Sequence, residues 1–185
     1  MAEASDVTLY TSGHLGTEEV FGIQAEKWGV REVTYSFEGH KPKRERGLKV
    51  LSPEELDHGN VSFDIIDKHM ERVYRHTMTM RKVFQTLFHV INQGYQVFGV
   101  GWLLSNGTLK GGTGWGIELA KFFNRPVHVF DLESKEWVTW DNGEWVLEDP
   151  LIVHKTFAAT GTRFPTDEAK EAIAGLFERS FGGKA

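Results

Sequence analysis

The spacing of apolar residues alternates along the chain between the two-residue period of a strand and the three-to-four-residue period of a helix. Short apolar or alternating runs predict strands at 7–11, 33–37, 95–104, 127–132 and 155–159. Helical spacing predicts helices at 17–28, 53–57, 62–93, 117–123 and 166–179, with a break expected near 77–79. Strands at 136–140 and 144–147 flank Asp141-Asn142-Gly143, which is typical of a tight hairpin turn.

Strands that alternate with helices predict an α/β fold with a mostly parallel sheet. We therefore expect one domain over 1–185, a Rossmann-like three-layer sandwich with a small added β-hairpin. Ligands of such sheets bind at the carboxyl ends of the strands. Four loops follow strands there and carry glycine with hydroxyl or basic side chains: 12–17, 38–46, 105–114 and 160–163. These loops are the candidate walls of one site, and 38–49 is expected to be an exposed loop.

Composition narrows the class of protein. Hydrophobic residues make up 40% of the 185 residues, which indicates a globular chain, and a net charge of -5 speaks against a nucleic-acid partner. The chain has no cysteine, which excludes disulfides, thiolate zinc sites and cysteine nucleophiles. The longest apolar stretch, 97–104, is too short to span a bilayer, and the first residues lack a signal-peptide pattern. We expect a cytoplasmic protein with no membrane partner.

The most informative motif is Gly111-Gly112-Thr113-Gly114-Trp115-Gly116-Ile117-Glu118, between a predicted strand and a predicted helix. A glycine-rich turn into a helix presents backbone N–H groups at the positive end of the helix dipole, which suits a phosphate or another anion. Gly111, Gly112, Thr113 and Gly114 are the predicted anion cradle, and Glu118 can face whatever binds there. The alternative is a tight connection whose glycines allow close packing.

The loop after the first strand supplies a second set of candidates. Ser12, Gly13 and Thr17 are expected to form the wall opposite the glycine run. His14 can hydrogen-bond a ligand or act as an acid or base, although a loop histidine is commonly a structural donor.

The loop after the last strand carries Gly161, Thr162 and Arg163. The planar guanidinium of Arg163 suits bidentate binding of a phosphate or carboxylate. The alternative is a surface arginine that pairs locally. Parallel strands place their carboxyl ends on one edge, so we expect Arg163 and Gly112 to lie at the same site.

Other charged and aromatic groups leave more than one interpretation open. The basic side chains of 41–46 can close over an anion or form a solvated loop. Trp137, Trp140 and Trp145 on the hairpin can stack a base, form a dimer contact or simply pack. The eight histidines are scattered, so no metal site is expected.

Five stretches together resemble the SLOG superfamily of Rossmann-like proteins: 11–18, 35–40, 110–118, 126–131 and 157–163. Within it the chain is similar to the YpsA-like proteins, including the circularly permuted branch of molybdenum-cofactor carriers, and is related to the LOG-type phosphoribohydrolases. The hydrolases carry Gly-Gly-x-Gly-Thr-x-x-Glu. The glycines and Glu118 match this motif, whereas Trp115 stands at the threonine and Lys110 at the preceding proline.

The resemblance implies a phosphorylated, nucleotide-like ligand. It implies either N-glycosidic hydrolysis of a nucleoside monophosphate or a non-catalytic carrier or sensor, for a molybdopterin-type cofactor or a nucleotide signal. In a hydrolase, Glu118 would be the acidic catalyst, assisted by Arg75 or Arg81 on the long helix, with Arg75 preferred. We also expect a homo-oligomer, a dimer. A structural protein with a vestigial site is the remaining alternative.

Overall fold

The computed structural model describes residues 3–71 and 77–183. Its strands are β1 Thr8–Thr11, β2 Arg31–Phe37, β3 Leu48–Leu51, β4 Gln96–Gly101, β5 Val127–Asp131, β6 Glu136–Asp141, β7 Glu144–Leu147 and β8 Thr156–Gly161. Its helices are α1 Thr17–Trp28, α2 Pro53–Asp57, α3 Val61–Met70, α4 Met78–Gln93, α5 Gly111–Phe122 and α6 Asp167–Phe181. Two short 3-10 turns, η1 Ala4–Asp6 and η2 His58–Asn60, complete the described elements.

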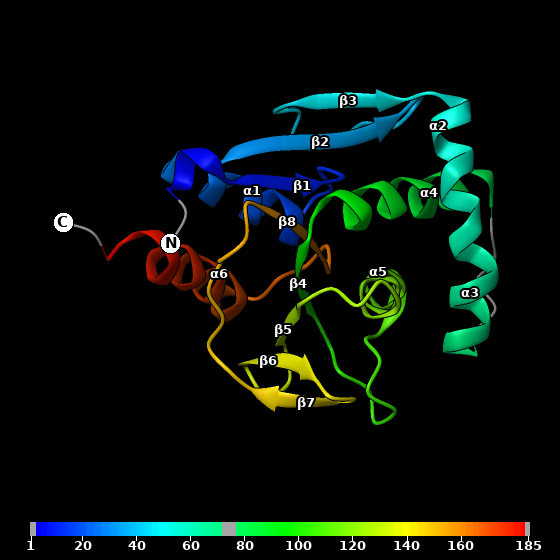
Figure 1. Cartoon of the computed structure of the whole chain (residues 1–185). Helices are drawn as coiled ribbons and strands as arrows, with labels where there is room; N and C mark the ends of the chain where they lie inside the picture. The colour runs from blue at the N-terminus through cyan, green and yellow to red at the C-terminus, as the bar shows by residue number, and fades with distance from the viewer. Residues whose placement is uncertain (1–2, 72–76, 184–185) are drawn as a thin grey trace.

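The strands form one eight-stranded sheet in the order β3-β2-β1-β8-β4-β5-β6-β7 (Figure 1). All pairings are parallel except those of β5 with β6 and of β6 with β7. The last strand, β8, lies between β1 and β4. The loops that follow β1, β8 and β4 are therefore neighbours at the carboxyl edge, where the order of the strands reverses.

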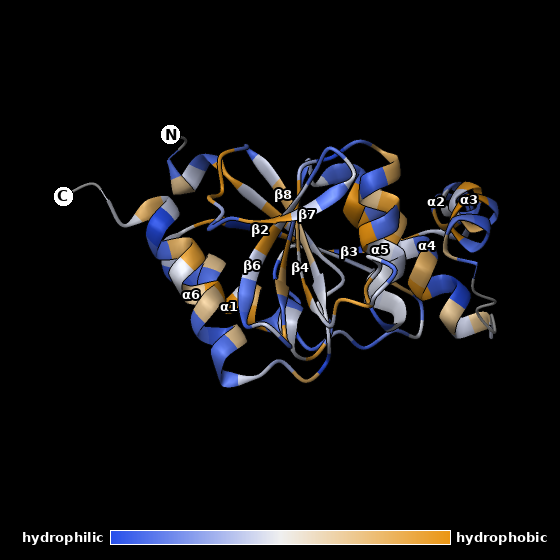
Figure 2. Cartoon of the chain, turned by 90° about the horizontal axis from the view of Figure 1, so that it is seen from below, coloured by the Kyte–Doolittle hydropathy of each residue, from blue (hydrophilic) through white to orange (hydrophobic). Residues whose placement is uncertain are grey.

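Helices cover both faces of the sheet, which confirms the predicted α/β sandwich (Figures 1 and 2). Helices α1 and α6 lie on one face, and α2 to α5 lie on the other. The first face buries Phe21 and Phe177 against the sheet residues Phe98 and Phe157. On the second face, α4 and α5 pack together and bury a separate apolar cluster around Trp115.

Several predicted boundaries are confirmed because the signals for them are local. Helix α1 ends where Gly29 takes the left-handed conformation, with φ of 77°. Helix α6 begins after Thr166, whose hydroxyl accepts a hydrogen bond from the Ala169 N–H. The β6–β7 turn has φ of 48° at Asn142 and 88° at Gly143, as a type I′ turn requires.

Two predicted boundaries are wrong. The predicted loop at 38–49 contains the start of the edge strand β3, which pairs with β2 from Thr34↔Leu48 onward. The helix predicted from Ile117 begins six residues earlier, at Gly111. Glycine disfavours a helix, but here tertiary packing prevails. Trp115 is fully buried against the Phe84 ring, at 4.7 Å between centroids, and this contact holds the first turns in place.

In the described part of the chain, no helix combines the length and apolarity needed to cross a membrane.

Candidate functional site

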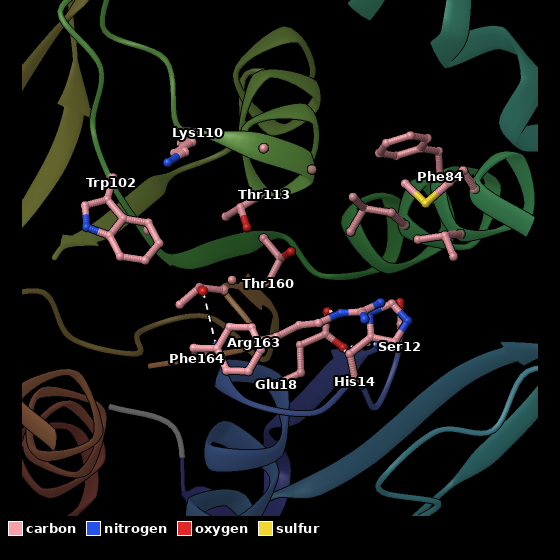
Figure 3. A pocket seen from close by; sticks show the side chains of 18 residues that line it. Ser12, His14, Glu18, Phe84, Trp102, Lys110, Thr113, Thr160, Arg163 and Phe164 are labelled. Carbon is pink, nitrogen blue, oxygen red and sulfur yellow. Dashed lines mark hydrogen bonds and ion pairs between the residues drawn. The ribbon is translucent and has the colours of Figure 1, made fainter. Parts of the chain in front are cut away.

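A pocket of about 390 Å³ opens at the carboxyl edge of the sheet, within the size range of small-molecule sites (Figure 3). The loops after β1, β4 and β8 and one face of α4 surround it. Polar lining comes from Ser12, His14, Glu18, Lys110, Thr113, Thr160, Thr162 and Arg163, with the backbone of Gly101, Gly111, Gly112 and Gly161. Apolar lining comes from Met80, Val83, Phe84, Leu87, Trp102 and Phe164. Of the four loops expected to form the site, 38–46 does not reach this pocket.

The amino terminus of α5 opens into the pocket. Gly111, Gly112 and Thr113 are its first residues, and all three line the cavity. The first N–H groups of a helix have no carbonyl one turn earlier to bind. Lys110 is the N-cap residue and provides no side-chain hydrogen bond, and the first turn holds no acidic residue. Within the described part of the chain, this end of the helix therefore presents free donors and a positive dipole to the pocket.

Two cations stand at the same place. Lys110 and Arg163 line the pocket from different loops, and within 3–71 and 77–183 neither forms an ion pair. Gly16, at φ of 95°, lets the first loop approach the Arg163 backbone so closely that any Cβ there would overlap with it. The structure thus brings Arg163 and Gly112 to one pocket, as the parallel topology predicts.

Glu18 is a pocket residue that sequence reasoning missed. Its side chain is buried, at 4% exposure, and Oε2 accepts hydrogen bonds from the N–H groups of Ser12, at 3.0 Å, and His14, at 2.9 Å. The carboxylate thus occupies the donors of its own loop. Oε1 lies 3.9 Å from His14 Nδ1. The sequence signal that could have identified Glu18 is its position as the second residue of a helix that follows a glycine-containing loop.

His14 lines the pocket and meets His40 edge-on, at 5.0 Å between ring centroids. His40 shares a 2.8 Å hydrogen bond with the Ser36 hydroxyl through Nδ1 and stacks on Phe37. Burial, helped by the charges of His14 and Arg163, lowers the pKa of His40 to about 4. His40 is therefore neutral at pH 7 and adds no positive charge beside the pocket.

Three predicted ligand-binding residues hold the loops together and do not line the pocket. Thr17 donates from its hydroxyl, at 2.8 Å, and from its N–H, at 3.1 Å, to the carbonyl of Thr162. The carbonyl of Gly13 accepts from the N–H of Lys43 at 2.7 Å. Gly114 is buried against the carbonyl of Leu109, where a Cβ would overlap. The predicted close-packing role of glycine applies to Gly114, and the open cradle consists of 111–113.

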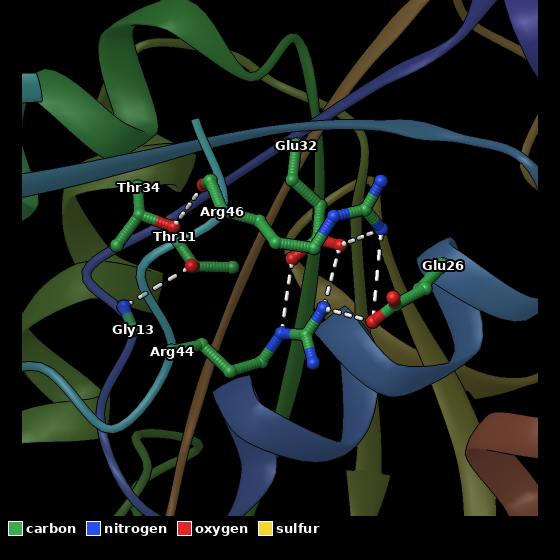
Figure 4. A network of polar contacts seen from close by, with 7 residues as sticks. All are labelled: Thr11, Gly13, Glu26, Glu32, Thr34, Arg44 and Arg46. Atoms are coloured by element: carbon green, nitrogen blue, oxygen red, sulfur yellow. Dashed lines mark hydrogen bonds and ion pairs between the residues drawn. The ribbon is translucent and has the colours of Figure 1, made fainter. Parts of the chain in front are cut away.

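The two arginines of the basic loop 41–46 form ion pairs within the protein (Figure 4). Arg44 binds Glu32 at 2.8 Å and Glu26 at 3.0 Å, and Arg46 binds Glu32 at 2.8 Å. Glu32 is on β2 and Glu26 on α1, so these pairs fasten the loop to the sheet and to a helix. The neighbouring Lys41 is exposed and lies outside the pocket lining.

Glu118 faces away from this pocket. It is 1% exposed, and its two oxygens contact Lys121 Nζ at 2.8 Å and His69 Nε2 at 3.0 Å. It lines a second cavity on the other side of α5, together with Lys121 and Trp140. The structure therefore separates Glu118 from the glycine cradle, which the sequence places beside it.

Of the two arginines suggested for the long helix, only Arg81 is in the described part of the chain, and it does not line the pocket. Arg75 lies outside the described residues. Arg81 donates to Asn60 Oδ1 at 2.8 Å and stacks over the Phe63 ring at 4.8 Å. Among the residues that the structure describes, no group of three or more His, Asp or Glu side chains is arranged to hold a metal ion.

Comparison with known proteins adds no relative to this description. No family model matches the chain, and neither a curated protein nor a solved structure matches it significantly. Its function must therefore be inferred from the pocket itself.

Proposed function

We propose that the protein binds a phosphorylated, nucleotide-like small molecule in the pocket at the carboxyl edge of the sheet. The observation that carries this proposal is the open amino terminus of α5 beside two cations, Lys110 and Arg163, that form no ion pair with any described residue. Free N–H groups at a helix start bind phosphate, and charge-assisted hydrogen bonds strengthen that binding. The phosphate would lie against 111–113.

The rest of the pocket suits the organic part of such a ligand. Val83, Phe84 and Leu87 form an apolar wall on α4, and the exposed rings of Trp102 and Phe164 stand at the other end (Figure 3). Aromatic rings bind planar bases by stacking. A volume of about 390 Å³ favours a ligand the size of a mononucleotide. This chemistry agrees with the ligand class that the SLOG resemblance implies.

Glu18 adds a hydrogen-bond acceptor. Its Oε2 is used by its own loop, so Oε1 is the oxygen that a ligand hydroxyl or amino group can reach. A purely anionic ligand would be repelled by this carboxylate. Glu18 therefore favours a ligand that carries a phosphate at one end and hydrogen-bond donors beside it.

Calorimetry with AMP, GMP, CMP and UMP tests the proposal. Gly112→Asp places a carboxylate in the cradle and should weaken binding at least about tenfold, or about 1.4 kcal/mol. Gly112→Ala is the matched control, because its Cβ would lie at an ordinary 3.7 Å from Phe84 and add no charge. Equal affinities of Gly112→Asp and wild type would remove the cradle. If no nucleotide binds, native mass spectrometry for a co-purified molecule separates a molybdopterin-type ligand from an empty site.

A second candidate function is N-glycosidic hydrolysis of the same ligand, and the Glu18 carboxylate in the pocket favours it. Water would add to the ribosyl carbon while the base leaves with a proton, and Glu18 would stabilise the developing positive charge. Chromatography of reactions with the four monophosphates detects free base. Glu18→Gln should then reduce the release, and absence of free base with wild type supports a carrier or sensor.

A further inference from the structure

The segment between β4 and α5 forms a small two-sided arm, residues 102–110. The Lys110 N–H donates to the Trp102 carbonyl at 3.0 Å, Leu103 pairs with Leu109, and the Leu104 N–H donates to the Thr108 carbonyl at 2.8 Å. Both ends of the arm line the pocket, through Trp102 and Lys110. The position of the arm therefore determines where the Trp102 ring and the Lys110 ammonium lie in the proposed site.

The tip of the arm is fixed by the β6–β7 hairpin and by α5. Trp145 donates from Nε1 to the Gly107 carbonyl at 2.8 Å, and Lys121 donates to the same oxygen at 3.3 Å. Lys121 Nζ also lies 3.7 Å from the Trp140 ring centroid and 4.7 Å from that of Trp145. One ammonium thus joins the arm to two tryptophans of the hairpin through a hydrogen bond and cation–π contacts.

Glu118 holds this ammonium in place. Its Oε1 lies 2.8 Å from Lys121 Nζ; the Glu118 side chain is buried and that of Lys121 is partly buried. Burial lowers the pKa of Lys121, while the hydrogen bond and the charge of Glu118 oppose that shift. Removing the carboxylate would leave a partly buried ammonium without its counter-charge, which is costly. Lys121 would then lose the position from which it binds Gly107.

We propose that Glu118 is a positioning residue: through Lys121 and the hairpin tryptophans it holds the arm 102–110, and so sets Trp102 and Lys110 in the pocket. Its effect on a ligand rests on the proposed function, whereas its effect on the arm does not. The inference also gives the β6–β7 hairpin a role, which is to support the arm from the antiparallel end of the sheet.

The full chain carrying Glu118→Gln or Lys121→Met tests this. Hydrogen exchange of the amides in 102–110 should rise at least about tenfold without ligand, because the tip loses its support. Nucleoside monophosphate affinity should fall about five- to twentyfold, and the double variant should lose no more than the worse single variant. Lys121→Arg keeps a cation over the tryptophans and should rescue both effects. Lys135→Met removes a distant, exposed pair with Glu168 and should change neither.

Kinetics and hydrogen exchange together distinguish the positioning role of Glu118 from the proposed ligand binding. If the protein is a hydrolase, Glu118→Gln should raise KM while kcat stays within a few-fold, and a large loss of kcat alone would overturn the inference. Unchanged exchange of 102–110 in both folded variants would overturn it as well. Trp145→Phe removes the indole donor to Gly107 while it keeps an aromatic ring, and it supplies the same test if the charge variants fail to fold. If wild type binds no nucleotide, exchange alone decides the inference and the proposed function fails separately.

Discussion

Glu18 and Glu118 each lie in a helix that follows a strand at the same edge of the sheet, yet their surroundings differ. Glu18 is the second residue of α1 and turns back to bind the N–H groups of its own loop. Glu118 is the eighth residue of α5, about 10 Å further along its helix than Gly111, and binds Lys121 instead. The Glu18 carboxylate uses the donors of the loop before α1. The start of α5 has no such carboxylate in its first turn.

The difference shows which helix terminus is available to an anion. At α1, a ligand phosphate would compete with a carboxylate that is already covalently attached, and it would be repelled by it. At α5, the first turn holds no acidic residue, and Lys110 and Arg163 stand beside it. A glycine-rich loop before a helix therefore predicts an anion site only where no nearby carboxylate already uses its donors.

The strongest way to break this comparison is to remove the carboxylate at α1. Glu18→Ala leaves the N–H groups of Ser12 and His14 without their acceptor, so the free energy of unfolding should fall by about 2–4 kcal/mol. Urea denaturation measures this change. Glu19→Ala, at the next position, is the control and should stay within about 0.5 kcal/mol of wild type. If Glu18→Ala changed the free energy of unfolding as little as Glu19→Ala does, water would satisfy the N–H groups of Ser12 and His14.

The next effect concerns the open end. Arg163→Ala should weaken binding of a nucleoside monophosphate by about 1.5–3 kcal/mol, the range for a hydrogen bond to a charged group. The melting temperature should change little, because Arg163 is exposed and has no acidic partner in the described chain. Arg31→Ala, at the amino end of β2, is the control. Affinity unchanged by Arg163→Ala would place the anion elsewhere.

A third test concerns protonation, and it compares a histidine near the pocket with one far from it. Burial lowers the pKa of His128 to about 4, and it is also the main cause of the pKa of about 4 at His40. An unfolded histidine has a pKa of about 6.5. The neutral ring of His128 fits its contacts, because its Nε2 accepts a hydrogen bond from Gln96 and its Nδ1 lies 2.7 Å from the Thr139 hydroxyl.

Between these pKa values the unfolded chain binds more protons than the folded one. Stability should therefore be complete above about pH 6.5 and fall as the pH drops toward 4, by at most about 1.4 kcal/mol per pH unit for each histidine. Thermal melts across this range measure the slope. In Arg163→Ala the pKa of His40 should rise, because one nearby positive charge is gone, and that of His128 should not move. NMR titration distinguishes the two, and parallel shifts would contradict the arrangement.

The candidate site was predictable in part. The presence of Arg163 and Gly112 at one pocket follows from the parallel strands, whose carboxyl ends share one edge of the sheet. Thr17 and Gly114 do not line the pocket, because whether a loop residue lines a cavity or packs beneath it depends on its neighbours in space. The expected dimer, the cytoplasmic location and the nucleotide itself stay predictions.

By itself the sequence determined the elements whose signals are local. The limits of α1, the Asn142-Gly143 turn and the Thr166 cap depend on a few adjacent residues and their backbone preferences. Tertiary structure alone decided the edge strand β3, the start of α5 at Gly111 and the opposite roles of Glu18 and Glu118. Each of these depends on a partner far along the chain: β2 for the strand, Phe84 for the helix, and Lys121 with the hairpin tryptophans for Glu118. Packing against such partners outweighs propensities of about 1 kcal/mol per residue, so no local pattern records the outcome.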